Sequence, residues 1–114
     1  MADGLFDGSF ARLAEAWIAR ERLHALIARN IANADTPNYR ADTRGFAEVL
    51  AEVRGEALPW TEETAPPARM DGNTVDMQRE MARMARNQML YAATGDLLKM
   101  RIDGLLRVLR EGGQ

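Results

Sequence analysis

The longest regular hydrophobic pattern in the chain runs from Thr74 to Arg110. Apolar residues recur there at alternating steps of four and three, the heptad spacing of a helix that packs along one seam. The seam is broken in polarity only by Gln88 and in size by Gly95, and its positions are Met77, Met81, Met84, Gln88, Tyr91, Gly95, Leu98, Ile102, Leu105 and Leu109. The spacing predicts one helix of about 37 residues, roughly 55 Å long at 1.5 Å per residue. Asn73 or Thr74 is expected to cap its first turn.

A second pattern of the same period lies near the N-terminus, at Phe6, Phe10, Leu13, Trp17, Arg20, His24, Ile27 and Ile31. It predicts a helix over roughly 9–33, which Asn33 and Pro37 end. Two heptad helices in one chain favour an antiparallel, coiled-coil-like pair. We expect its intrachain seam to be formed by Leu13, Trp17, Ile27, Ile31, Met84, Tyr91, Leu98, Ile102 and Leu105.

The regular spacing disappears between the two patterns. Residues 43–54 fit one short amphipathic helix, which Gly55 ends, and the proline-rich stretch that follows reads as loop. Trp60 in that loop either folds back on the chain's own helices or anchors a neighbouring protein. The expected fold is therefore all-α, an elongated antiparallel two-helix hairpin with an irregular middle. Its parts are a flexible lead-in (1–8), the N-terminal helix of the core (9–36), a connecting segment (37–73) and the long helix (74–114).

The C-terminal half of the long helix carries a second apolar row away from the seam, at Leu90, Ala93, Leu97, Met100, Gly104 and Val108. A helix that is apolar nearly all round is buried on nearly all sides. The first helix is shorter and covers one side only. We therefore expect neighbouring subunits, rather than the middle segment, to cover this row, and Gly95 and Gly104 to admit a neighbouring backbone. This pattern is typical of an assembly component.

Composition removes several other classes of function. The chain has 114 residues and a net charge of −2, which argues against a dedicated nucleic-acid binder. The absence of cysteine excludes disulfides and thiolate chemistry. No apolar run is long enough to insert into a membrane, and no basic and apolar leader typical of a cleaved signal peptide is expected at the N-terminus.

Catalytic chemistry is also missing from the sequence. The single histidine, His24, falls on the first helix's seam, where a packed side chain is expected. No spacing suits a metal site, a cofactor or a tuned acid–base pair, so we expect no enzyme, no metal and no cofactor. Two groups of arginines at helical spacing are interleaved with acids, which favours solvated helix faces; they are Arg20, Arg22 and Arg29, and Arg79, Arg83 and Arg86.

Two motifs carry a resemblance to a known family. The stretch from Asn30 to Tyr39 resembles the signature that ends the N-terminal helix of the bacterial flagellar axial proteins, the rod and hook family. The stretch from Asp71 to Met77 resembles the start of the C-terminal helix in a short proximal-rod member. Asn38 stands where the family usually has Gly, and Asn is the next best residue for positive φ. The motif positions are Asn30, Ile31, Ala32, Asn33, Thr36, Pro37, Tyr39, Gly72, Asn73, Val75, Asp76 and Met77.

The resemblance implies a structural role. Members polymerise helically into the hollow rod, the drive shaft that transmits torque and conducts exported subunits. The implied partners are copies of the chain itself, other rod proteins, the inner-membrane ring with its rod-junction protein, and the flagellar type III export apparatus. The implied location is the basal-body rod on the periplasmic side of the inner membrane, reached without a cleaved signal peptide.

Three alternatives compete with this reading. One is another short rod protein of the same family. A second is a free helical-hairpin adaptor for a single partner, which needs one apolar face where a polymer subunit needs several. The third is a regulatory nucleic-acid binder, which would show steeply salt-dependent binding to duplex.

Overall fold

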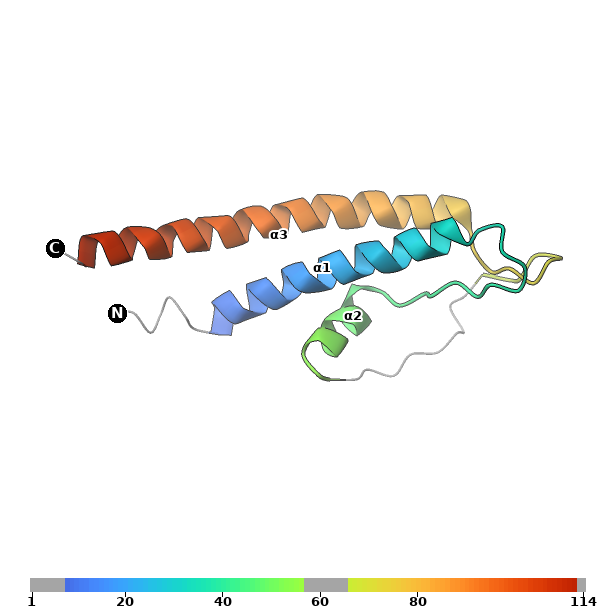
Figure 1. Cartoon of the computed structure of the whole chain (residues 1–114), viewed down its shortest axis with the longest axis horizontal. Coiled ribbons are helices and arrows are strands. Elements are labelled where there is room, and N and C mark those ends of the chain that lie inside the picture. The colour runs from blue at the N-terminus through green and yellow to red at the C-terminus, as the bar shows by residue number, and fades with distance from the viewer. Residues whose placement is uncertain (1–7, 57–65, 113–114) are drawn as a thin grey trace.

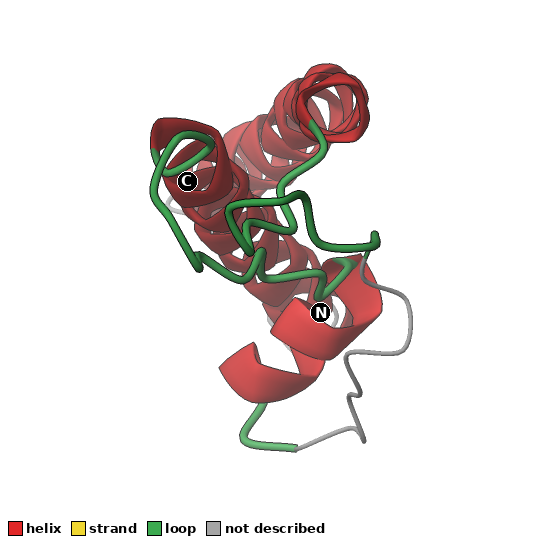
Figure 2. Ribbon diagram, turned by 90° about the vertical axis from the view of Figure 1, so that its right-hand side faces the viewer, coloured by secondary structure: helices red, strands yellow, loops and turns green. Residues whose placement is uncertain are grey.

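The computed structural model describes residues 8–56 and 66–112, with three helices: α1 (Gly8–Ala32), α2 (Phe46–Val53) and α3 (Met77–Gly112). Helices α1 and α3 run antiparallel side by side, and α2 packs on the other side of α1 (Figure 1 and Figure 2). The radius of gyration is 18.5 Å and the extents are 69 × 25 × 15 Å. A compact domain of 100 residues would have a radius of about 13 Å. The predicted all-α, elongated hairpin is confirmed.

The apolar core lies mainly between α1 and α2. Leu23, Leu26 and Ile27 of α1 pack with Val49 of α2, and each is at most 6% exposed. α3 adds only the half-buried Met84 to this cluster. The expected short helix is therefore present, and it belongs to the core rather than to a loop.

The seam between α1 and α3 is only partly buried, since two helices leave both flanks of their contact open. Ile27 is fully buried, whereas the half-buried members are Leu13, Trp17, Ile31, Met84, Tyr91, Leu98 and Leu105. Trp17 stacks on Tyr91 with the ring centroids 5.2 Å apart. Ile102, expected in the seam, is 40% exposed, because it lies on the open flank beyond the region that α1 covers.

Polar side chains take inward positions in the first half of α3. Glu80 and Asn87 are each 2% exposed, whereas Met77 and Met81 are 41% and 57% exposed. Asn87 accepts from Arg20 Nη1 at 3.2 Å and donates to the Arg20 carbonyl at 2.9 Å. The prediction that Met77 and Met81 face α1 is therefore wrong, because hydrogen bonds to α1 turn Glu80 and Asn87 inward instead.

The helix ends also differ from the sequence reading. α1 stops at Ala32, before its expected core segment ends at 36, and α3 starts at Met77 rather than at 74. The prediction that Asn73 or Thr74 caps α3 is wrong. The Asp76 carboxylate instead accepts from the Arg79 backbone N–H at 3.2 Å, which is the capping geometry. His24, expected to be packed, is exposed and lines a shallow pocket with Glu21 and Gln88.

Gly95 lets Trp17 approach the α3 backbone. A Cβ built on Gly95 would lie 2.9 Å from Trp17 Nε1, whereas a Cβ on Gly104 would meet nothing within 4 Å. The space at Gly95 is thus occupied by the chain's own indole, not by a neighbouring backbone as expected. Gly104 remains open.

These two glycines give a matched pair of substitutions. Gly95→Ala is expected to lower the free energy of unfolding by about 1–2 kcal/mol, because the cost of displacing Trp17 exceeds the gain in helix propensity. Gly104→Ala is expected to raise it by up to about 1 kcal/mol, since only the propensity changes. Urea unfolding followed by circular dichroism measures both. Equal shifts in the two variants would contradict the close approach at Gly95.

Candidate functional site: a polar joint and an exposed helix face

The two motif segments meet at one end of the molecule, where α1 ends and α3 begins (Figure 1). We call this region, formed by residues 30–44 and 69–83, the polar joint. Asn30 is fully buried at their centre. Its amide nitrogen donates to the Asp42 carbonyl at 2.9 Å and to Glu80 Oε2 at 3.2 Å. Its oxygen accepts from the Tyr39 hydroxyl and from the Asp42 N–H, both at 3.0 Å. A side-chain amide has two donors and two lone pairs, so Asn30 is fully satisfied.

Asn73 closes the end of α1. Its amide nitrogen donates to the carbonyls of Asn33 and Thr36, both at 2.8 Å, and its oxygen accepts from the Val75 N–H at 2.7 Å. The last carbonyls of a helix have no partner within the helix. Asn73 supplies partners from a segment about 40 residues away, and so it ties the beginning of the α3 segment to the end of α1.

The motif turn contains two residues with left-handed backbone. Asn38 has φ 63° and Gly72 has φ 80°, and the Asn38 N–H donates to the Asp71 carbonyl at 2.8 Å. A Cβ at Gly72 would lie 2.3 Å from Asn38 Oδ1, so only glycine fits there without rearrangement. The expectation that Asn38 preserves the turn is confirmed.

Two extended stretches run side by side next to this turn. The Thr74 N–H donates to the Tyr39 carbonyl at 3.0 Å, and the Ala41 N–H donates to the Thr74 hydroxyl at 2.7 Å. The Arg69 guanidinium bonds the carbonyls of Val75 and Ala34, which fixes both stretches to the end of α1. Val75, at 3% exposure, packs with Ala34 and Ala41 in a second small apolar cluster.

An ion pair between half-buried Arg83 and buried Glu80 completes the joint. Arg83 Nη1 lies 3.1 Å from Glu80 Oε1, and Arg83 Nη2 donates to the Arg44 carbonyl at 2.6 Å. A buried carboxylate is stable only when it is paired and hydrogen-bonded. Glu80 has both, from Arg83 and from Asn30.

Asp42 adds a pH-dependent contribution to the joint. Burial raises the pKa of Asp42, but hydrogen bonds and charge from Arg44 outweigh it, so the pKa lies below its usual value. A lowered carboxyl pKa contributes stability that is complete above the unfolded value near 3.9 and is lost as pH falls below it.

Asp42→Asn is therefore expected to flatten the acid side of the stability profile. The variant should lose less stability than the parent chain between about pH 4 and pH 2.5, while being less stable at pH 7. Urea unfolding at half-unit pH steps measures this. Asp35→Asn, at an exposed acid in the turn, removes one carboxylate outside the joint and is the control. If Asp42→Asn lost as much stability below pH 4 as the parent chain, Asp42 would not supply the pH-dependent contribution.

The remaining motif positions are distributed over the surface of the joint. Ile31, Tyr39 and Gly72 are half-buried, while the exposed positions are Ala32, Thr36, Pro37, Asp76 and Met77. Sequence reasoning missed Thr74, Arg69, Glu80 and Arg83. The three-residue spacing of Glu80 and Arg83 was a signal for an ion pair, but it is equally common on solvated helix faces.

The second apolar row of α3 is largely open. Leu97, Met100 and Val108 are 53%, 67% and 45% exposed, and Ala93 is exposed as well. Leu90 and Gly104 are half-buried. The Arg101 guanidinium donates to the Ser9 hydroxyl at 3.1 Å, so α1 begins level with Arg101. Residues 102–112 extend past that point, as Figure 1 shows at the C-terminal end of α3. Trp60, the other candidate contact, lies outside the described residues.

Leu106 and Leu109, on other sides of α3, are also 50% and 60% exposed. Exposed apolar surface that is continuous along a helix marks a contact site for another protein. Over the part of the chain that the structure describes, no group of acidic or histidine side chains is arranged to hold a metal ion. None of the described helices is long and apolar enough to cross a membrane.

Comparison with known proteins yields a consistent set of relatives. The chain is 35% identical to the flagellar basal body rod protein FlgB of Escherichia coli strain K12, covering 86% of this chain and 90% of the relative. It is 34% identical to FlgB of Cereibacter sphaeroides over 85% of this chain and 90% of the relative. It is 32% identical to FlgB of Aeromonas hydrophila over 92% of this chain and 95% of the relative. No protein-family model matches the chain.

Proposed function

Because the chain belongs to the FlgB family of flagellar basal body rod proteins, it is a structural subunit rather than an enzyme, and we propose that it polymerises helically into the proximal part of the rod. In this role it forms part of a hollow drive shaft that transmits torque and conducts exported subunits. Its place in the cell is the flagellar basal body.

The exposed apolar row on α3 is the observation that carries the polymerisation proposal. Five apolar side chains of the C-terminal half of α3, Leu97, Met100, Leu106, Val108 and Leu109, are between 45% and 67% exposed in one copy. Burying apolar surface between subunits supplies about 25 cal/mol per Å². We infer that neighbouring subunits cover the row Leu90, Ala93, Leu97, Met100, Gly104 and Val108, and that Trp60 contributes a further contact.

The parts of the chain then have separate roles. Residues 9–36 and 74–114 are proposed to pack in the rod wall. Residues 37–73 connect them and contribute α2 to the core and part of the joint, and residues 1–8 are the proposed lead-in. The proposed neighbours are copies of the chain, other rod proteins, and the inner-membrane ring with its rod-junction protein. The chain is proposed to reach the periplasmic side of the inner membrane through the flagellar type III apparatus, without a cleaved signal peptide.

The alternatives have less support. The relatives reported above all carry one name, which speaks against another short rod protein such as FlgC. A single-partner adaptor needs one apolar face, whereas α3 exposes Leu97 and Val108 on one side and Leu106 and Leu109 on others.

A deletion strain tests the proposed function. Removing the gene is expected to abolish swimming and to leave basal bodies without a rod in electron micrographs. Expression of the unmodified chain from a plasmid should restore both. Normal rods and swimming in the deletion strain would refute the proposal.

A further inference from the structure

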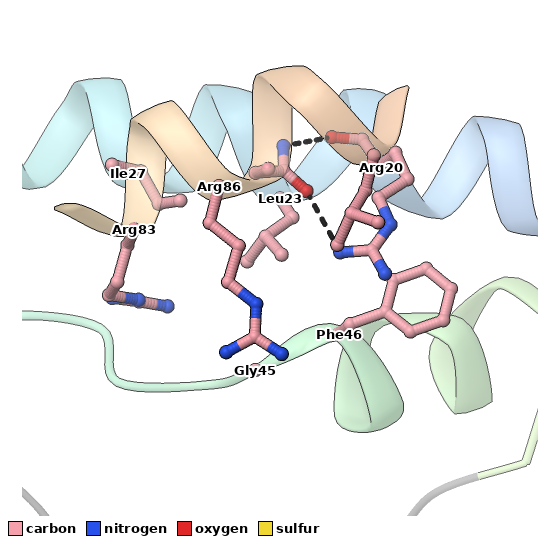
Figure 3. A pocket seen from close by; sticks show the side chains of 9 residues that line it. Arg20, Leu23, Ile27, Gly45, Phe46, Arg83 and Arg86 are labelled. Carbon is pink, nitrogen blue, oxygen red and sulfur yellow. Dashed lines mark hydrogen bonds between the residues drawn. The ribbon is translucent and has the colours of Figure 1, made fainter. Parts of the chain in front are cut away.

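A groove of about 360 Å³ lies between α1, α3 and the start of α2 (Figure 3). Its lining combines apolar walls with arginines, and among the described residues no acidic side chain contributes to it. The lining residues are Arg20, Leu23, Ile27, Gly45, Phe46, Arg83, Arg86, Asn87 and Leu90. The arginine faces predicted to be solvated therefore contribute to a concave surface.

Two of the three arginines in the groove have no acidic ion-pair partner in the part of the chain that the structure describes. Arg83 is paired with Glu80, as described above. Arg20 lies 3.7 Å above the Phe46 ring centroid and donates to Asn87. Arg86 extends into the groove (Figure 3) and has no hydrogen-bond or ion-pair partner among the described residues. Burial, and then the charge of Arg86, lower the pKa of Arg20. Like charges held beside apolar walls are stabilised when an anion is placed between them.

We propose that this groove receives residues 56–63 of a second copy of the chain, an acidic segment with apolar side chains. The inference rests on the proposed polymerisation. The segment contains Glu56, Glu62 and Glu63 with no basic residue, and it carries Leu58 and Trp60 between them. Residues 57–65 lie outside the described part of the chain.

The chemistry of the segment matches that of the groove. Glu62 and Glu63 supply two negative charges for Arg20 and Arg86, and Trp60 supplies an aromatic face for an arginine and for the apolar walls. Every copy has one such groove and one such segment. A head-to-tail contact of this kind repeats from subunit to subunit, as a helical polymer requires.

Cysteine cross-linking in assembled rods tests the contact, because the chain contains no cysteine of its own. One tagged copy carries Ala47→Cys, an exposed position beside Phe46. A second copy with a different tag carries Thr61→Cys. Both are expressed in the deletion strain, and isolated basal bodies are treated with a short bis-maleimide linker. The expected product is a dimer that carries both tags. Gln88→Cys replaces Ala47→Cys in the matched control, since Gln88 is exposed and lines the other pocket between α1 and α3.

Charge reversal tests whether the cross-link depends on the proposed ion pairs or only on the two cysteines lying close together. Arg86→Glu is expected to lower the yield of the mixed dimer by about tenfold, and Glu62→Arg with Glu63→Arg in the second copy is expected to restore it. Arg86 is exposed, so the substitution leaves the fold intact, which circular dichroism verifies. Rods without a mixed dimer, or a yield of mixed dimer unaffected by Arg86→Glu, would each overturn the inference. Rods missing from cells with the unmodified chain would instead refute the proposed function.

Discussion

Asn30→Ala is expected to lower the free energy of unfolding by about 3 kcal/mol or more. The change removes the hydrogen-bond partner of the Tyr39 hydroxyl and the Asp42 N–H, and one partner of the Glu80 carboxylate. Each buried group left unsatisfied costs about 1–3 kcal/mol, and more when the group is charged. Urea unfolding of the purified chain, followed by circular dichroism, measures the loss. A loss of this size raises the ratio of unfolded to folded chain by about a hundredfold.

Asn33→Ala is the matched control for this experiment. Asn33 lies one helical turn from Asn30, and its side chain makes only exposed hydrogen bonds, to the Arg29 carbonyl and to the Thr36 hydroxyl. The backbone carbonyl of Asn33 that Asn73 binds is unchanged by the substitution. A loss below about 1 kcal/mol is expected. If the two variants were equally stable, the buried network around Asn30 would not be what holds the two motif segments together.

Leu97→Asp is expected to abolish rod assembly while leaving the isolated subunit folded. Leu97 is 53% exposed in the single chain, so an aspartate there costs little before assembly. In a rod the same carboxylate would be buried in an apolar contact, which costs several kcal/mol for each subunit. The cost recurs in every copy, so a helical polymer is affected more than a single pair would be. The expected phenotype is a non-motile cell whose exported subunit is folded but whose basal bodies lack the rod.

Ala92→Asp serves as the comparison for Leu97→Asp. Ala92 is exposed on the same helix but does not belong to the second apolar row. It introduces the same charge at a nearby position, so rods and swimming should be retained. Electron microscopy of isolated basal bodies and swimming in soft agar measure both variants. Normal rods in Leu97→Asp would show that the row is not covered by neighbouring subunits.

The sequence predicted the parts of the fold that depend on local spacing. The heptad steps located α1 and α3, and the apolar residues of 43–54 located α2. In each case the periodicity of apolar residues reflects one buried face, which can be recognised without knowing the partner. The exposed row that includes Leu97 was recognised in the same way, as apolar residues in excess of what α1 covers.

The polar joint could not be predicted in the same manner. Glu80 and Arg83 have the composition of a solvated helix face, and only their contacts with Asn30 and the Arg44 carbonyl make them buried. Asn30 and Glu80 are 50 residues apart in sequence, so no local pattern connects them. Asn73 has the residue type of a helix cap but closes α1 rather than α3. The motifs indicated where the joint lies, while its hydrogen-bond partners required the three-dimensional structure.

The joint has a consequence for how the chain can change in length. It fixes the end of α1 and the start of α3 to each other through Asn73 and Arg69, and so the geometry of the two long helices does not depend on how much chain lies between α2 and Arg69. Doubling a flexible connection costs only about 0.6 kcal/mol of closure entropy. A reporter protein or an extra domain whose own ends lie close together should therefore be tolerated between Thr64 and Pro66, after the segment proposed to contact the next subunit. The joint makes this position an insertion point, through which a subunit can acquire an added domain while its helical core stays the same.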